Sequence, residues 1–476
     1  MTAAPLWTAD AADAATGGTS TAAWIANGIS IDTRTLSPDD LFVALSGPNF
    51  DGHDFLDKAF AAGAAAAMVS TAAPPGQSGR PLTVVGDTLA GLRALAAAAR
   101  DRMTGRVAAI TGSVGKTGTK EALAHVLRAQ GSVSASQSSL NNHWGVPLSL
   151  ARMPAASDFG IFEIGMNHAG EIADLVPLAR PHVAVVTAIA PAHIANFDSV
   201  ADIARAKAEI FSGLDGGIAV INRDTEHFDL LADIALRTGA REVVGFGRSP
   251  QADMRLVECL SSATGNEINA IWRGREFRYR VEQPGVHWAY NSLAVLAAAD
   301  ALGADIDRAA DALATLPSLK GRGALHTLPW AGGTLRLVDD AYNANPESMR
   351  AALDTLGALA PTGGRRVAVL GDMLELGDAS VAAHAGLKAH LDRNGIDIVF
   401  LAGREIRALA DTLEAGRIGG IADDADSLVP LLIGGLVAGD VVTVKASHGI
   451  ALERAVAALL EHAAAENKKG NKTHAL

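Results

Sequence analysis

The chain has 476 residues, of which 49% are hydrophobic and 19% charged, and its formal net charge at pH 7 is −12. This length predicts about three domains of roughly 150 residues each, and the acidic surplus argues against a nucleic-acid binder because it would repel a phosphate backbone. No apolar run approaches the roughly 18 residues of a membrane span, so we expect no membrane insertion. No basic residue precedes Arg34, which argues against a secretory signal, and Cys259 is the only cysteine, which leaves no partner for a disulfide or a zinc–thiolate cluster. We therefore expect a cytoplasmic protein.

Short apolar runs alternate with helical patterns along the whole chain, which predicts βα units and mostly parallel sheets. The apolar runs lie at residues 41–45, 66–70, 82–85, 107–110, 159–164, 183–189, 217–221, 335–338, 367–370, 396–401 and 441–444. They fall into three groups, so we predict an α/β protein with domains at residues 1–104, 105–322 and 323–476. No fixed-period repeat is present, and the polar, basic segment 466–476 is expected to be a disordered tail.

A phosphate-binding loop is predicted where the sequence TGSVGKT, from Thr111 to Thr117, joins an apolar strand to a helical pattern. Four residues can turn backbone N–H groups toward a polyphosphate: Gly112, Ser113, Val114 and Gly115. Lys116 would reach the terminal phosphates, and the Thr117 hydroxyl would hold Mg²⁺. The full-length motif has a glycine where this chain has Ile110, and a tight turn with a surface lysine is the alternative. The loop alone indicates nucleotide binding and leaves kinase, GTPase, ATPase and ligase open.

Two polar side chains follow the next apolar runs, at the strand ends where α/β sheets collect ligands. Glu163 ends one run and His193 follows another, so both could complete the coordination of a Mg²⁺ ion held by Thr117. Alternatively, Glu163 caps a helix and His193 fills a turn. Lys207 falls in a helical pattern further on, where a solvated surface lysine is the default interpretation.

Several segments, in the right order between about residue 30 and residue 450, resemble the Mur ligases of peptidoglycan precursor synthesis. They are the phosphate loop with its strand at 107–117, NNHWGVP at 141–147, EIGM at 163–166, GVH at 285–287 with Asn291, and the N-terminal segment 31–55. Two further segments, DDAYNANPESM at 339–349 and LGDMLELG at 370–377, are similar to the member that joins D-alanyl-D-alanine to UDP-N-acetylmuramoyl-tripeptide. The resemblance implies a small UDP-precursor domain, a central ATPase-like domain and a Rossmann-like C-terminal domain that carries the dipeptide. It also implies a monomer that activates the tripeptide carboxylate as an acyl phosphate.

The resemblance also implies roles for residues around ATP. The loop residues would cradle its phosphates, Asn291 and His287 would border the adenine, and Arg322 and Asp340 would contact phosphate and ribose. Thr117 and Glu163 would bind one Mg²⁺, and His193 and Lys207 a second one. Lys207 would be N6-carboxylated, which replaces an ammonium by an acid that can hold a hard cation. Lys116, Lys207, His193 and Glu163 would be the catalytic residues.

The remaining implied roles concern the two substrates. Thr33 and Arg34 would contact the UDP portion, Asn141 and Asn142 the rest of the precursor, and Asn343 and Asn345 the dipeptide, although two asparagines near a proline also suit an ordinary turn. The chain departs from the family at His448, where an arginine for the dipeptide carboxylate is common, and at Asp39, where glycine is common. Either His448 serves when protonated or another basic residue replaces that arginine.

Three other functions stay open. A sibling ligase that adds a single amino acid, or a folate polyglutamylating enzyme, would share the phosphate loop, although NANP and the N-terminal DGH segment disfavour both. A regulatory protein could bind UDP-precursors without ligating them, and it would need neither Lys207 nor His193. A nucleic-acid module is disfavoured by charge. The pattern leaves diaminopimelate and lysine open at the third peptide position, and closure about segments near residues 105 and 322 is expected to assemble the site.

Overall fold

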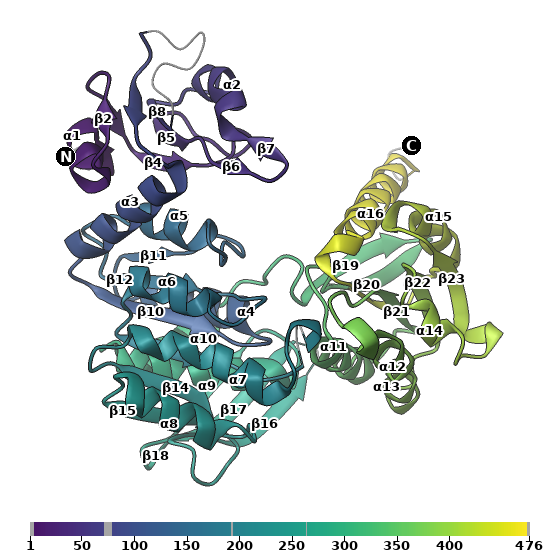
Figure 1. The fold of residues 1–476 in the computed structure, drawn as a ribbon. Helices are drawn as coiled ribbons and strands as arrows, with labels where there is room; N and C mark the ends of the chain where they lie inside the picture. The colour runs from purple at the N-terminus through teal and green to yellow at the C-terminus, as the bar shows by residue number, and fades with distance from the viewer. Residues whose placement is uncertain (1–3, 71–78, 192–193, 263, 474–476) are drawn as a thin grey trace.

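The computed structural model describes residues 4–70, 79–191, 194–262 and 264–473. Three larger sheets follow one another along this part of the chain, and helices pack around each of them (Figure 1). Most neighbouring strands are parallel, so the α/β class and the mostly parallel sheets predicted from the sequence are confirmed.

The N-terminal sheet has the strand order β2-β9-β8-β5-β4 in the described residues, with β2 antiparallel to β9 and the other pairs parallel. Its strands are β2 (Thr19–Ser20), β4 (Gly28–Ser30), β5 (Asp40–Val43), β8 (Ala66–Val69) and β9 (Leu82–Val84). The helices beside it are α1 (Ala9–Thr16), α2 (Leu56–Ala61) and α3 (Thr88–Arg102), and two short pairs join β1 (Trp7–Thr8) to β3 (Ile25–Ala26) and β6 (Ser46–Gly47) to β7 (Phe50–Asp51).

The N-terminal and central parts share one hydrophobic core. Leu41, Val43 and Met68 belong to the same buried cluster as Leu148 and Ala151 of helix α5 (Gly145–Ala151), which lies beyond the predicted boundary near residue 105. The indole Nε1 of Trp7 also donates a hydrogen bond of 2.9 Å to the carbonyl of Ala151. Because movement at this seam would expose buried apolar surface, the N-terminal part is firmly attached to the central one.

The central sheet has the order β11-β12-β10-β13-β14-β15-β16-β17-β18 in the described chain. Its strands are β10 (Arg106–Thr111), β11 (Val133–Ala135), β12 (Phe159–Glu163), β13 (Val183–Val186), β14 (Ile218–Asn222), β15 (Glu242–Gly247), β16 (Met254–Ser262), β17 (Gly265–Trp272) and β18 (Arg275–Val281). The last three are antiparallel to one another, an extension that the sequence analysis did not anticipate. Strand β10 lies between β12 and β13, so the chain leaves it at a point where the strand order reverses, the usual ligand position in such sheets.

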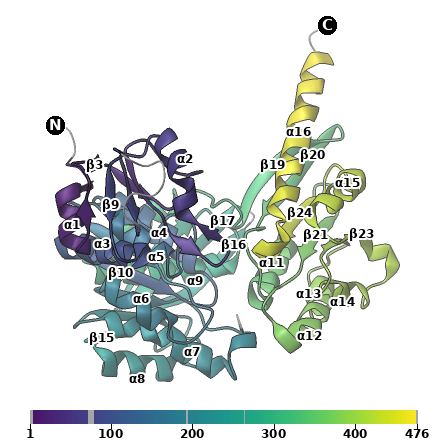
Figure 2. The same ribbon diagram turned by 45° about the horizontal axis from the view of Figure 1, so that its top comes forward.

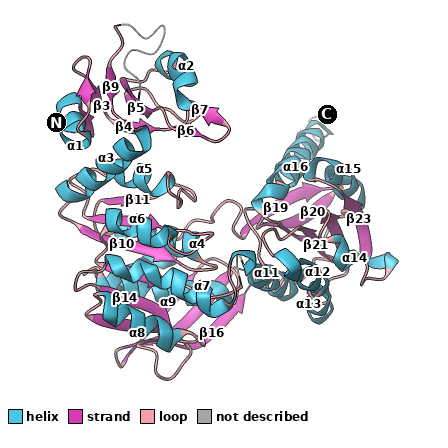
Figure 3. Ribbon diagram, viewed as in Figure 1, coloured by secondary structure: helices cyan, strands magenta, loops and turns pink. Residues whose placement is uncertain are grey.

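Helices cover both faces of the central sheet (Figure 3). Helices α4 (Lys116–Arg128), α9 (Val286–Ala301) and α10 (Ile306–Leu313) contribute to one core, and α6 (Glu171–Ala179), α7 (Val200–Ala208) and α8 (Phe228–Thr238) to the other. This two-sided burial explains why the strands read as continuous apolar runs rather than alternating patterns.

The C-terminal sheet has the order β19-β20-β24-β21-β22-β23 in the residues described. Its strands are β19 (Ala324–Trp330), β20 (Gly333–Asp339), β21 (Arg366–Gly371), β22 (Ile398–Ala402), β23 (Ile418–Ala422) and β24 (Val441–Lys445). The helices around it are α11 (Pro346–Ala358), α12 (Ser380–Ala385), α13 (Leu387–Arg393), α14 (Arg407–Ala410), α15 (Ala425–Gly435) and α16 (Glu453–Thr473).

The expectation of a disordered tail is wrong for most of its length, because helix α16 continues to Thr473 (Figure 2). The alanines and glutamates that precede the tail are strong helix formers, so the helix propagates into the polar residues. None of the described helices is both long and apolar enough to cross a bilayer.

Candidate active site

The predicted phosphate loop lies between β10 and the first turn of α4, at the carboxyl edge of the central sheet. Both of its glycines are required by geometry. Gly112 has φ +149°, and a Cβ there would lie 1.9 Å from Thr187 Oγ1. Gly115 has φ +83°, and a Cβ there would lie 2.7 Å from Asn291 Oδ1. No other residue type fits either position without displacing a neighbour.

Residues that follow β13 hold this loop in place, a role that the sequence analysis missed. The Ser113 amide donates to the Ala188 carbonyl at 2.8 Å, and the Ser113 hydroxyl donates to the Ala190 carbonyl at 2.9 Å. The Thr187 hydroxyl donates to the Val114 carbonyl at 2.6 Å. The N–H of Ser113 is therefore used inside the protein, whereas the first-turn amides of Lys116 and Thr117 have no intrahelical acceptor and face the end of the loop.

Lys116 lies across this loop. Its Nζ donates to the carbonyl of Gly112 at 2.8 Å, so the ammonium lies over the position where the loop would hold phosphate. Burial lowers the pKa of Lys116, Glu163 acts in the opposite direction, and the positive charge of Arg322 lowers the pKa further. Glu163 lies at the end of β12 and bonds to Thr117, the residue after Lys116, and Arg322 precedes β19 of the C-terminal sheet.

Glu163 is the centre of a small buried network at the end of β12. Only 1% of its surface is exposed. Its Oε2 accepts a hydrogen bond from the Thr117 hydroxyl at 2.6 Å, and its Oε1 accepts one from Asn141 Nδ2 at 2.7 Å. The Ser136 hydroxyl accepts the Glu163 amide at 3.2 Å. The structure thus brings Thr117, Glu163 and Asn141 together at one strand end, as the sequence analysis expected for the first two.

Lys207, on helix α7, is not the surface lysine that base rates predict. Only 1% of its surface is exposed, and it makes no hydrogen bond or ion pair with a described residue. Burial lowers its pKa well below the usual lysine value, and the charge of Lys116 adds to that effect. An unpaired buried amine of this kind is a signature of functional sites. His193, the residue expected to act with it, lies outside the described residues, and no group of three or more His, Cys, Asp or Glu side chains that could hold a metal occurs among those described.

The residues expected to contact the nucleotide come from two parts of the chain. Helix α9 places Asn291 against Gly115, and His287 lies on the first turn of the same helix. Arg322 donates from Nη2 to Ser139 Oγ at 3.2 Å, and its guanidinium lies 4.3 Å from the centroid of the Tyr342 ring. Burial lowers the pKa of His287. A Cβ on Gly285, the residue before α9, would lie 2.8 Å from Thr355 Oγ1, so α11 of the C-terminal part lies close to this helix.

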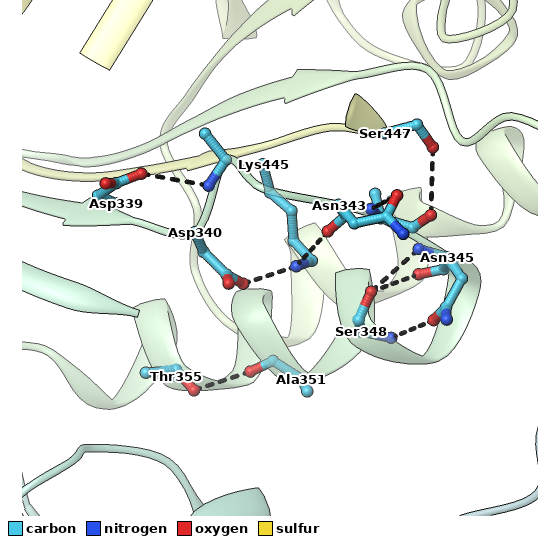
Figure 4. A network of polar contacts seen from close by, with 11 residues as sticks. Asp339, Asp340, Asn343, Asn345, Ser348, Ala351, Thr355, Lys445 and Ser447 are labelled. Carbon is cyan, nitrogen blue, oxygen red and sulfur yellow. Dashed lines mark hydrogen bonds and ion pairs between the residues drawn. The ribbon is translucent and has the colours of Figure 1, made fainter. Parts of the chain in front are cut away.

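The expected dipeptide residues lie in a polar network between β20, α11 and β24 (Figure 4). Lys445 Nζ donates to Asp340 Oδ2 at 2.7 Å and to the Asn343 carbonyl at 3.0 Å. The side-chain oxygen of Asn345 accepts the Ser348 amide at 2.9 Å and so caps α11. The structure therefore gives Asn345 a helix-capping role that leaves only its NH₂ group for a ligand.

His448 stands beside this network, on the side of Tyr342. The two rings are stacked, with centroids 5.4 Å apart and an interplanar angle of 24°. Its Nδ1 lies 3.7 Å from Glu453 Oε1, and 67% of the side chain is exposed. The histidine that replaces the family arginine is therefore accessible to a ligand carboxylate.

The residues expected to contact the precursor lie on the N-terminal side. Thr33 and Arg34 form a turn after β4, where Arg34 pairs with Asp32 at 2.6 Å and remains exposed. Asp39 has φ +67°, so it keeps the left-handed conformation that favours glycine and that Asp tolerates better than most residues. The side-chain oxygen of Asn142 accepts hydrogen bonds from the amides of Gly145 and Trp144 at 2.9 Å and 3.2 Å, so it is used in the turn that leads into α5.

Family models cover most of the chain. The Mur ligase family, catalytic domain model matches residues 26–99, the Mur ligase middle domain model matches 110–299, and the Mur ligase, glutamate ligase domain model matches 321–448.

Relatives and solved structures agree with these models. The chain is 38% identical to the UDP-N-acetylmuramoyl-tripeptide–D-alanyl-D-alanine ligase of Escherichia coli K12, over 91% of this chain and 94% of that one. It is 33% identical to the ligase of the same name from Bacillus subtilis 168, over 92% and 94%. A crystal structure of MurF from Acinetobacter baumannii superimposes with a TM-score of 0.82 at 28% identity, covering 96% of this chain and 99% of that one. The crystal structure of MurF from Thermotoga maritima in complex with ADP superimposes with a TM-score of 0.75 at 27% identity, covering 92% of this chain and 98% of that one.

Proposed function

The chain belongs to the Mur ligase family, and from that premise we propose how its residues act. It is an ATP-dependent ligase that joins D-alanyl-D-alanine to UDP-N-acetylmuramoyl-tripeptide in peptidoglycan synthesis, on which cell shape and division depend. The observation that carries this function is the contact of Arg322 with Ser139, because it joins the central domain, at the segment after β11, to the start of the C-terminal domain. We place the enzyme in the cytoplasm as a monomer.

The reaction has two steps. A carboxylate is a poor electrophile until one of its oxygens becomes part of a leaving group. An oxygen of the tripeptide's terminal carboxylate attacks the γ-phosphorus of ATP, the bond to the β,γ-bridging oxygen breaks, and ADP leaves an acyl phosphate behind. The amine of D-alanyl-D-alanine then attacks the acyl carbon, loses a proton and displaces inorganic phosphate as the amide forms. Positioning and charge stabilisation are the protein's main contributions to such phosphoryl transfer.

The central domain would bind the triphosphate. The loop from Gly112 to Gly115 and the first-turn amides of α4 would hold the phosphates together with Lys116, and Asn291, which lies beside Gly115, would contact the base. Arg322 would contact a phosphate and Asp340 the ribose. One oxygen of Asp340 is held by Lys445, so the carboxylate is oriented before the nucleotide arrives.

The oxygen donors near the loop fit a hard divalent cation. Thr117 Oγ1 and Glu163 Oε2 lie side by side in a buried position, and Glu163 is held from its other oxygen by Asn141. Lys207 fits a carbamate, because a buried neutral amine can add CO₂ with loss of a proton and so gain two oxygens. With His193, it would hold a second ion. Mg²⁺, when bound, neutralises charge on the transferring phosphoryl group.

The two substrates would reach the loop from opposite domains. Thr33, Arg34, Asn141 and Asn142 would contact the UDP-tripeptide, and Asn343, Asn345 and His448 the dipeptide. Because the N-terminal and central parts share a core, we expect closure to come from the C-terminal domain moving about the segment near Arg322.

An assay of phosphate release tests this function against its alternatives. The purified protein is given ATP, Mg²⁺ and UDP-N-acetylmuramoyl-tripeptide, with D-alanyl-D-alanine, D-alanine, L-lysine or L-glutamate as the amine. We expect phosphate release only with the dipeptide and only when the UDP-tripeptide is present. Turnover with one amino acid would identify a sibling ligase, and binding of the UDP-tripeptide without turnover under any condition would indicate a regulatory protein.

A further inference from the structure

A second lysine of helix α4 is completely buried. Lys120, one helical turn after Lys116, has 0% of its surface exposed. Its Nζ donates to the carbonyls of Ser136 and Ser138 at 2.6 Å and 2.9 Å, and it pairs with Glu121 Oε1 at 2.6 Å. These three partners use all the donors that an ammonium has. Lys120 therefore has no donor left for a nucleotide, and any contribution to the reaction has to pass through the groups that it holds.

The groups that it holds belong to the segment 136–139, which follows β11. Ser138 has φ +48°, a left-handed conformation that is costly for a residue other than glycine and persists only where the surroundings enforce it. The Lys120 ammonium contributes to holding this conformation, because it donates a hydrogen bond to the carbonyl of Ser138 itself. The segment is thus held in a strained conformation by a buried charge.

This segment contacts two residues of the candidate active site, Glu163 and Arg322. The Ser136 hydroxyl accepts the Glu163 amide, and the Ser139 hydroxyl accepts Arg322 Nη2. Two residues later, Asn141 donates to Glu163 Oε1. A small change in the path of residues 136–139 would therefore move the contacts of Glu163 and Arg322 together.

We propose that Lys120 is a positioning residue for ligation. Its buried ammonium fixes residues 136–139 so that Ser139 meets Arg322 and Asn141 meets Glu163, and it links the helix that carries Lys116 to the segment that leads to the precursor contacts. This proposal rests on the proposed ligase function. The alternative is that Lys120 contributes only to folding, as any well-packed residue of α4 does.

Kinetics of Lys120→Met and Lys120→Arg, with Leu123→Ala as the matched control, separate these roles. Leu123 is equally buried on the same helix but belongs to the hydrophobic core. We expect Lys120→Met to lower kcat by about 10- to 100-fold, the scale of a misplaced catalytic group, and to raise both KM for UDP-tripeptide and the Kd of a nonhydrolysable ATP analogue, because Glu163 and Arg322 lose their positions together. Lys120→Arg should recover part of the loss, and Leu123→Ala should lower the unfolding temperature without this kinetic pattern.

Ser138→Pro tests the same segment without altering the buried helix. Ser138 is exposed, and proline fixes φ near −65°, so the left-handed conformation becomes impossible while folding of α4 is unaffected. We expect the kinetic pattern of Lys120→Met. Wild-type kinetics in Ser138→Pro, or a pattern in Lys120→Met that matches Leu123→Ala, would overturn the positioning role. A wild-type protein that fails to ligate would instead contradict the proposed function.

Discussion

The Thr117 hydroxyl donates a 2.6 Å hydrogen bond to Glu163 Oε2, joining the first turn after the phosphate loop to the end of the neighbouring strand. Both groups are buried, and the other carboxylate oxygen is held by Asn141. The pair offers two oxygens at a fixed separation beside the loop, an arrangement that suits a hard cation. The carboxylate charge of Glu163 would then bind a cation rather than only cap a helix.

Replacing Glu163 by Gln tests whether this carboxylate binds a cation. The amide keeps the size of the side chain but removes the charge, so we expect kcat to fall by about 100- to 1,000-fold, as when one electrostatic partner of the transition state is lost, and the Mg²⁺ requirement to rise. Asp158→Asn is the control, because Asp158 precedes the opposite end of the same strand and holds Ser132 there. Phosphate release over a Mg²⁺ titration measures kcat and the Mg²⁺ requirement of each variant. Equal behaviour of the two variants would contradict a cation role for Glu163.

Lys207→Met should remove activity and stabilise the fold. Because the folded-state pKa of Lys207 is lowered, the unfolded chain binds a proton that the folded one does not, and wild-type stability falls as pH falls through the window between the two pKa values. In metal-free protein purged of CO₂, we expect the variant to be more stable by about 1–3 kcal/mol, with a difference that grows as pH falls. Chemical denaturation at several pH values measures this, and a destabilised variant would show that Lys207 has a stabilising partner.

Carboxylation of Lys207 gives a separate, spectroscopic prediction. Addition of CO₂ needs the neutral amine, and the lowered pKa of Lys207 raises the neutral fraction of this amine at any given pH, so the carbamate should be lost as pH falls. A carbon-13 NMR signal from labelled bicarbonate is expected in the wild type and not in Lys207→Met. A signal of equal intensity in both proteins would place the carbamate on another amine.

Gly115→Ala should weaken nucleotide binding through a defined collision. The new Cβ would lie 2.7 Å from Asn291 Oδ1, whereas a Cβ at Gly216, also at positive φ, would meet nothing within 4 Å. Gly216→Ala therefore controls for backbone strain alone, which costs of order 1 kcal/mol in both variants. We expect KM for ATP to rise by about tenfold or more only in Gly115→Ala, equivalent to about 1.4 kcal/mol. Equal effects of the two substitutions on KM for ATP would show that Asn291 does not contribute to the nucleotide site.

His448→Arg should improve use of the dipeptide. Arginine is always charged and can bind a carboxylate through two parallel hydrogen bonds, whereas the exposed histidine offers one at a time. We expect KM for D-alanyl-D-alanine to fall by about 3- to 10-fold in this variant and to rise in His448→Ala, while KM for ATP stays constant as the internal control. If neither variant changes KM for the dipeptide, another basic residue contacts its carboxylate.

The sequence predicted the parts of the site that are local. The strand before Gly112, the helix after Gly115 and the position of Glu163 at a strand end all follow from apolar runs and turn residues within a few positions of each other. Asp39 was identified as unusual only through the family resemblance, because glycine is common at its position, and its positive φ gives the physical cause.

Contacts between residues far apart in the chain could not be predicted from local sequence patterns. Nothing near Lys120 in the sequence indicates that it is buried beneath residues 136–139, and nothing near Ser139 indicates that it meets Arg322. Asn142 and Asn345 were assigned to substrates, and the structure also uses their oxygens locally. The oxygen of Asn142 accepts two amides in the turn before α5, and that of Asn345 caps α11, roles that side chains of this type commonly take. The antiparallel extension β16–β18 was missed because its partly exposed strands give no continuous apolar run.

A crystal structure of the protein with a nonhydrolysable ATP analogue and Mg²⁺ tests the central claim most directly. We expect the triphosphate to lie over residues 112–117 with its base beside Asn291, and density for Mg²⁺ within bonding distance of Thr117 Oγ1 and Glu163. A nucleotide bound elsewhere, or an unoccupied phosphate loop at saturating analogue, would contradict it.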